Sequence, residues 1–155
     1  MHPYSDQDIT QREAILRRLR HMLEQQRERF QEYLVVLDRQ QTAINQDSVD
    51  FLAQQVEMET AVLEQIIQTQ KTIVPLEQMY QELSRESVFP ADISELQKNL
   101  TDMRIRISSH NEGNRARLSE RIEQMRMKAS QLRVPNRHAS PYAAISGGQM
   151  VDIHG

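Results

Sequence analysis

Histidine is the side chain here best suited to acid–base chemistry or metal binding, because it titrates near neutral pH and its ring nitrogens bind metal ions. The chain has five histidines, at His2, His21, His110, His138 and His154, and no cysteine. None follows a glutamate by three residues, which is the Glu-x-x-His spacing of di-iron helical bundles. Glycine-rich phosphate loops, His-Glu-x-x-His zinc motifs and Gly-x-Ser-x-Gly nucleophile turns are absent from the sequence as well. We therefore expect no enzyme, no cofactor and no metal site, and we place His110 at the edge of a helical bundle.

Binding to nucleic acid or membranes is also disfavoured by composition. The formal net charge is -3, and the basic part of the chain, residues 104–138, has no aromatic rings among its arginines for base stacking. No run approaches the roughly 20 apolar residues that span a bilayer. The lack of cysteine fits a reducing compartment. We expect a soluble cytoplasmic protein with no stable membrane insertion.

Apolar residues recur every seventh position through the first third of the chain. They are Ile9, Leu16, Leu23, Phe30, Leu37 and Ile44. This spacing predicts one α-helix of about 37 residues, about 55 Å long, whose narrow apolar side must pack against other long helices. We expect these six residues to form a continuous buried seam.

Capping and breaking residues place the ends of this helix and of the next one. The first helix is predicted to begin near Ser5 or Asp6 and to end near residues 45–46, because residues 47–50 resemble an N-cap. The second helix repeats the heptad but has Glu59 at a seam position, and we place Glu59 at the edge of the seam. Pro75 lacks an amide hydrogen, so the second helix is expected to end or kink there.

A third helix is predicted to begin at residues 92–95, where an aspartate is followed three residues later by glutamate. Its apolar spacing falters at residues 110–114, and Gly113 within them predicts a weak point. Beyond residue 134 the chain has prolines and glycines and no periodicity. The predicted fold is all-α: an elongated antiparallel bundle of three long helices with coiled-coil-like packing over residues 5–133, and a disordered C-terminal tail over residues 134–155.

Charge is distributed unevenly along the chain. Residues 46–102 contain 11 acidic and 3 basic side chains, whereas residues 104–138 contain 9 basic and 3 acidic ones. One interpretation is that solvated faces of opposite charge complement each other within the bundle. The other is that the basic end of the third helix receives an acidic or amphipathic partner.

Two segments near the first helix–helix turn resemble the FlgN family of flagellar export chaperones. They are residues 34–44, LVVLDRQQTAI, and residues 47–52, DSVDFL. A helix carrying Glu57, Glu59 and Glu64 follows them, as in that family.

Later parts of the chain are similar to the same family. Residues 114–118, NRARL, followed by residues 120–122 and Met125, look like its last long helix. Tyr142 with the glycine pair 147–148 in a short tail is similar again. The resemblance covers most of residues 10–145.

This resemblance implies a cytoplasmic helical chaperone for type III protein secretion in flagellum assembly. Its partners would be hook-associated proteins of the FlgK and FlgL kind, which it would deliver to the export gate protein FlhA. The apolar stripe that resumes in the third helix is a plausible place for an amphipathic client helix. We assign client binding to Leu118, Ile122, Met125, Ala129 and Leu132. Tyr142 is the expected export-gate contact, because it is an isolated aromatic ring in the tail.

A second interpretation stays open beside the chaperone. A constitutive coiled-coil adaptor or structural protein would use the same heptads for permanent self-assembly. The two differ in oligomeric state, because a chaperone should be a discrete monomer or small oligomer and a structural coiled coil a stable elongated one.

Overall fold

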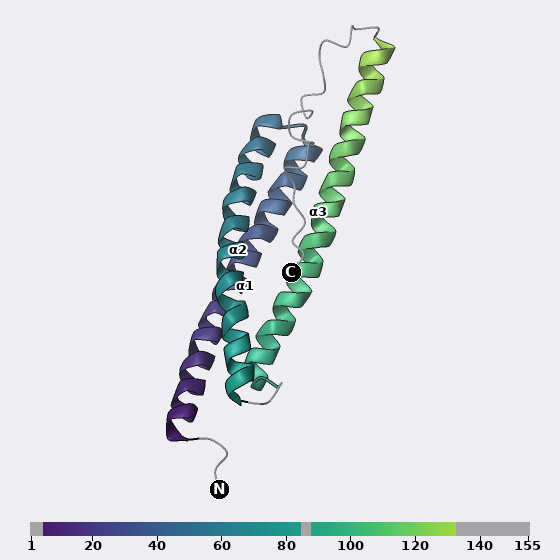
Figure 1. Cartoon of the computed structure of the whole chain (residues 1–155). Coiled ribbons are helices and arrows are strands. Elements are labelled where there is room, and N and C mark those ends of the chain that lie inside the picture. The colour runs from purple at the N-terminus through teal and green to yellow at the C-terminus, as the bar shows by residue number, and fades with distance from the viewer. Residues whose placement is uncertain (1–4, 85–87, 133–155) are drawn as a thin grey trace. The chain divides into compact units, whose positions relative to one another are not determined.

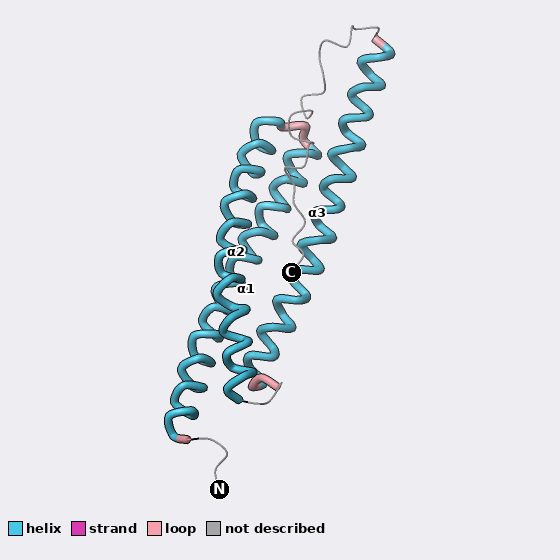
Figure 2. The backbone as a smooth tube through the Cα atoms, viewed as in Figure 1, coloured by secondary structure: helices cyan, strands magenta, loops and turns pink. Residues whose placement is uncertain are grey.

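The computed structural model describes residues 5–84 and 88–132, and these residues form helices without a strand. The helices are α1 (Asp6–Asn45), α2 (Val49–Ser84) and α3 (Ala91–Gln131) (Figures 1 and 2). The predicted all-α fold with three long helices is confirmed. The tail predicted at residues 134–155 lies outside the described residues.

The beginning of α1 and the α1–α2 turn follow the capping chemistry of the sequence. Ser5 Oγ accepts a hydrogen bond from the Asp8 amide at 3.1 Å, and Asp8 Oδ2 accepts one from the Ser5 amide at 3.3 Å, which is a capping box. At the other end, the Ser48 amide donates to the Ala43 carbonyl and the Asp47 amide to the Ile44 carbonyl. Asp47 has a φ of 52°, the left-handed conformation of a Schellman motif. The predicted positions of both ends are therefore correct.

The two expected breaks do not interrupt the helices. Pro75 lies on the exposed side of α2, which continues to Ser84, so no separate helix forms after it. The proline cannot donate the amide hydrogen bond to the Lys71 carbonyl, yet the helix continues through it. Gly113 lies inside α3, and a Cβ added there would meet nothing within 4 Å.

The described residues form two compact units, each built from a segment of every helix. Unit 1 comprises residues 5–31, 63–84 and 88–103, and unit 2 comprises residues 32–62 and 104–132.

Contacts within each unit give the helix directions. In unit 1, Arg12 of α1 lies beside Tyr80 of α2 and Gln26 donates to the Ile66 carbonyl, so α1 and α2 are antiparallel there. In unit 2, Gln40 donates to Glu59, and Ile44 packs in one cluster with Leu52 nearer the α1–α2 turn, so the two helices are antiparallel in this unit too. In unit 2 the α1–α3 pairs run from Tyr33 with Asn111 to Asn45 with Arg121, so these two helices are parallel there. The Arg20 guanidinium lies 2.6 Å from Asp92 Oδ2 and holds the pKa of that carboxyl below its usual range.

The predicted α1 seam is buried over most of its length but not at its beginning. Leu23, Phe30, Leu37 and Ile44 are fully buried, Leu16 is half-buried, and Ile9 is 42% exposed. The prediction is wrong at Ile9 because α3 begins at Ala91, where Asp92 pairs with Arg20, so Ile9 has no segment of α3 beside it. The Arg12 guanidinium lies 5.9 Å from the centre of the Tyr80 ring, so the antiparallel pairing places Ile9 opposite the last turn of α2.

This difference predicts unequal losses of stability along the stripe. Phe30→Ala should lower the free energy of unfolding by about 3–5 kcal/mol, because it leaves a cavity in the core of unit 1. Ile9→Ala, the matched control, should change it by less than about 0.5 kcal/mol. Urea unfolding monitored by circular dichroism measures both variants. Equal effects would mean that the seam is not the spine of the bundle.

Candidate functional site

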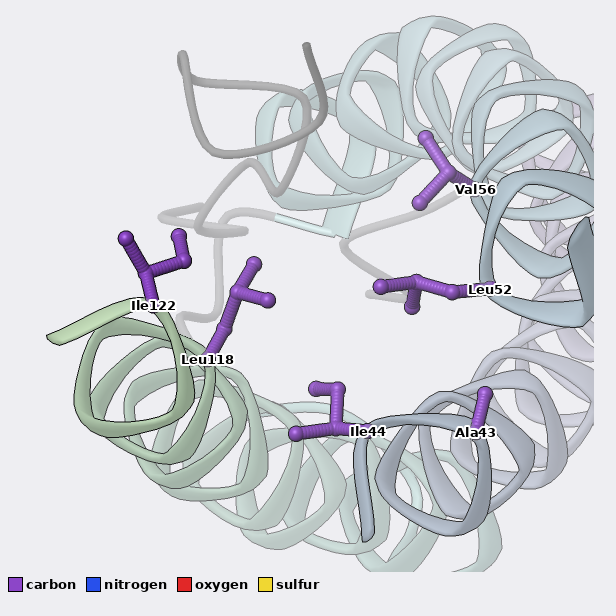
Figure 3. Close-up of a cluster of buried hydrophobic side chains, with 6 residues drawn as sticks. All are labelled: Ala43, Ile44, Leu52, Val56, Leu118 and Ile122. Atoms are coloured by element: carbon purple, nitrogen blue, oxygen red, sulfur yellow. The ribbon is translucent and has the colours of Figure 1, made fainter. Parts of the chain in front are cut away.

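The first two residues of the predicted client-binding set lie in the hydrophobic core of unit 2. Leu118 and Ile122 are buried in a cluster with residues from the end of α1 and the beginning of α2. The other members of this cluster are Ala43, Ile44, Leu52 and Val56 (Figure 3). Leu118 and Ile122 therefore hold α3 to the α1–α2 turn.

The remaining three residues follow the last contacts of α3 with that turn. Arg121 makes these contacts: its Nη2 donates to the Asn45 carbonyl at 3.2 Å, and its Nε lies 3.9 Å from Asp47 Oδ1. Beyond it, Met125 packs partly against the core cluster, Ala129 is half-buried, and Leu132 is 75% exposed. Figure 1 shows the last turns of α3 continuing past the α1–α2 turn.

These three residues define the candidate surface that we call the α3 end. Met125, Ala129 and Leu132 are four and three residues apart, so they share one side of the helix. Val49 and Phe51, at the beginning of α2, are half-buried apolar residues packed against the same core cluster as Met125. Tyr142, the predicted export-gate contact, lies outside the described residues.

Unit 2 contains a buried polar layer, which α3 reaches before the α3 end. Glu59 lies at the centre of this layer. Glu59 is only 1% exposed, so its predicted place at the seam edge is wrong. Tyr33 Oη donates to Glu59 Oε1 at 2.6 Å, and Gln40 Nε2 donates to Glu59 Oε2 at 3.0 Å. Burial of a carboxyl group costs free energy unless it is hydrogen-bonded, and both oxygens here have donors.

Two asparagines connect α3 to this layer. Asn111 Nδ2 donates to Tyr33 Oη at 3.2 Å, and Asn114 Nδ2 donates to the Leu37 carbonyl at 3.0 Å. Both side chains are fully buried. The apolar spacing of the sequence therefore falters at residues 110–114 because polar residues occupy core positions, and α3 itself is unbroken.

The heptad spacing of the sequence runs through these polar residues. Glu59 lies seven residues after Leu52 and seven before Ile66, and Asn111 lies seven before Leu118. A heptad that continues through a polar residue indicates a buried polar position as well as an edge position.

The layer is only partly satisfied. Among the described residues of the layer, Gln40 Oε1 and Asn114 Oδ1 are buried without a hydrogen-bond partner. Each such group costs about 1–3 kcal/mol relative to its hydration in the unfolded chain. The packing of α3 onto α1 and α2 therefore stabilises unit 2 less than it would with an apolar layer.

His110 lies at the α1–α3 edge of unit 2, as expected. Its Nε2 is 3.0 Å from Gln41 Oε1 and 3.6 Å from Asp38 Oδ1. Desolvation lowers the pKa of His110, the Asp38 carboxylate opposes this shift, and the Arg117 guanidinium adds to it. His110 and Asp38 also line a surface groove of about 470 Å³, together with Leu34 and Ile105.

Neither a metal site nor a membrane span is found in the part of the chain that the structure describes. Over residues 5–84 and 88–132, no three His, Cys, Asp or Glu side chains are grouped so as to hold a metal ion. The helices of this part also lack a stretch long and apolar enough to cross a bilayer.

Two buried tyrosines provide a matched test of the polar layer. Tyr33→Phe removes the hydroxyl that Glu59 and Asn111 share, so it should lower the free energy of unfolding by about 1–3 kcal/mol. Tyr80→Phe should change it by less than about 0.5 kcal/mol, because the Tyr80 hydroxyl makes no hydrogen bond within the described residues. Urea unfolding compares the two variants, and similar losses would contradict a role for the Tyr33 hydroxyl.

The lowered pKa of His110 predicts a pH dependence of stability. The unfolded chain, with an ordinary histidine pKa of 6.5, takes up a proton more readily than the folded protein does. Stability from this group is therefore fully present above pH 6.5 and decreases as the pH falls below it. Between about pH 7.5 and 5.5, the urea midpoint of His110→Gln should fall less than that of the wild type. An identical pH dependence would contradict this assignment.

Comparison with known proteins gives one relative over nearly the whole chain. No family model and no solved structure matches the sequence. Over 149 residues the chain is 30% identical to a protein of Treponema pallidum (strain Nichols), described as an uncharacterized protein, and the match covers 96% of this chain and 95% of that one. The chain therefore belongs to the same family as this Treponema pallidum protein.

Proposed function

We propose that the protein is a cytoplasmic export chaperone of the FlgN kind, which binds flagellar hook-associated proteins and delivers them to the export gate. The observation that carries the proposal is the α3 end, where an apolar side of the helix continues beyond the core that it helps to form. The sequence resemblance supports the proposal, because its last segment precedes and includes Met125.

The α3 end has the features of a surface for an amphipathic helix. Met125, Ala129 and Leu132 provide a narrow apolar strip, and a flexible methionine adapts to more than one client sequence. Arg121, Arg126 and Lys128 lie in the same segment. These cations favour a client helix with acidic residues beside its apolar side.

The polar layer supports a transient function of this region. Water can replace the hydrogen bonds of Asn111 and Asn114, whereas it cannot replace the burial of a leucine. The segment of α3 that leads to the client surface is therefore less costly to open than an apolar seam of equal length. We propose Tyr142 as the contact with the export gate protein FlhA, as the resemblance implies.

Direct binding to hook-associated proteins tests this proposal. The full chain should bind a purified hook-associated protein of the FlgK or FlgL kind from the same genome in isothermal titration calorimetry. Leu132→Glu should weaken this binding at least about tenfold, because it places a charge on the apolar strip. Met127→Glu is the matched control: Met127 is exposed on the same helix, but it lies two residues from both Met125 and Ala129 and faces the other side.

Hydrogen exchange gives an independent measurement. Amides of residues 123–132 should exchange faster than those of residues 23–44 in the free protein and slow down when the client is bound. Absence of binding to any hook-associated protein would contradict the function. Strong protection of residues 123–132 in a stable elongated oligomer would favour the structural coiled coil instead.

A further inference from the structure

The α2 segment of unit 1 exposes an apolar strip beside its buried side. Ile67 is 47% exposed, Val74 is exposed, and Leu63 is half-buried. These residues are four and seven positions apart, so they lie on one side of α2. Gln70, between Ile67 and Val74, accepts a hydrogen bond from Gln26 of α1, so the strip runs beside the α1–α2 contact. It is separate from the α3 end, which lies in unit 2.

Two charged residues of opposite sign flank Ile67 on this strip. Glu64 precedes it by three residues, and Lys71 follows it by four. Lys71 is the only cation of α2, which carries six acidic residues. Neither Glu64 nor Lys71 has an opposite charge three or four positions away in its own helix. Among the residues that the structure describes, neither side chain makes an ion pair or a hydrogen bond.

This arrangement is self-complementary under a two-fold axis. When two copies of α2 cross antiparallel near Ile67, Glu64 of each copy lies opposite Lys71 of the other, because the two charges are almost equally far from the crossing point. The same crossing covers the exposed part of Ile67. A partner helix with charge of one sign would instead meet one like charge.

We propose that this strip is a homodimer interface, in which α2 of one copy packs antiparallel against α2 of a second copy about Ile67. Ile67 is the apolar centre, and two symmetry-related Glu64–Lys71 ion pairs fix the direction of packing. The inference does not depend on the proposed function, because it uses no residue of the α3 end.

Sedimentation equilibrium of the full chain over a range of concentrations tests the interface. The wild type should show a monomer–dimer equilibrium, and Ile67→Arg should raise the dimer dissociation constant at least about tenfold. Met58→Arg is the matched control, because Met58 is 43% exposed on the same helix but nine residues away, on the opposite side. It should dimerise like the wild type.

Charge reversal tests the direction of packing without changing an apolar residue. Lys71→Glu should weaken the dimer about tenfold, since two ion pairs become two like-charge contacts. The double variant Glu64→Lys with Lys71→Glu should restore wild-type affinity, because it exchanges the two charges. Circular dichroism checks that each variant is folded, and if Ile67→Arg unfolds, the charge variants alone decide.

Three results would overturn the proposal. A wild type that stays monomeric at every concentration would exclude the dimer. A dimer that folded Ile67→Arg leaves intact would use another surface. A double variant as weak as Lys71→Glu would show that the Glu64–Lys71 pairs do not form.

Discussion

The buried carboxyl group of Glu59 constrains the packing of the whole of unit 2. A carboxyl group enclosed by helices needs hydrogen-bond donors at fixed places, and Tyr33 and Gln40 of α1 supply them. A seam of leucines and isoleucines tolerates a shift of one heptad, since the next residue of the stripe is also apolar. With Glu59 in the seam, a shift of α1 by one heptad in one direction would place Asp47 where Gln40 now donates, whereas the opposite shift would offer Gln26 and Tyr33 as donors. The polar layer therefore disfavours one of the two shifted alignments of α1 with α2, at the cost of the stability that apolar residues would have contributed.

The same layer makes the two units differ in how α3 is held. In unit 1, α3 contributes Ile93, Leu100 and Met103 to the core, and in unit 2 it contributes Ile107, Leu118 and Ile122, with Asn111 and Asn114 between the first two. A hydrogen-bonded amide contributes about 1 kcal/mol, and a buried leucine about 1.5–3 kcal/mol. At positions 111 and 114, α3 of unit 2 is thus held less strongly than leucines there would hold it, and this is also the segment that leads to the exposed α3 end.

Helix number, helix ends and most of the α1 seam could be predicted from the sequence, because they depend on local chemistry: the capping box at Ser5 and the heptad from Leu23 to Ile44. Features that depend on a distant partner could not. Ile9 fits the heptad, but α3 begins further along α1, beside Arg20. From the sequence alone Glu59 is typical of an edge residue, because its hydrogen-bond partners Tyr33 and Gln40 lie in another helix. Leu118 and Leu132 belong to one stripe, yet only the position of the α1–α2 turn decides that the first is core and the second exposed.

An apolar residue at heptad spacing thus looks the same in the sequence whether its side chain packs in the core or contacts another protein. In a three-helix bundle, each helix side is buried only where a neighbouring helix runs beside it, and sides without a neighbour remain exposed. Leu132 and Ile67 both lie on such sides. The charges next to them then distinguish the partners that each side accepts. Cations precede Leu132, which favours an acidic amphipathic helix, whereas Ile67 has one charge of each sign at nearly equal distances, which favours a copy of the same helix in the opposite direction. On these two proposals, a thin heptad core carries two binding surfaces that differ in specificity although their apolar chemistry is the same.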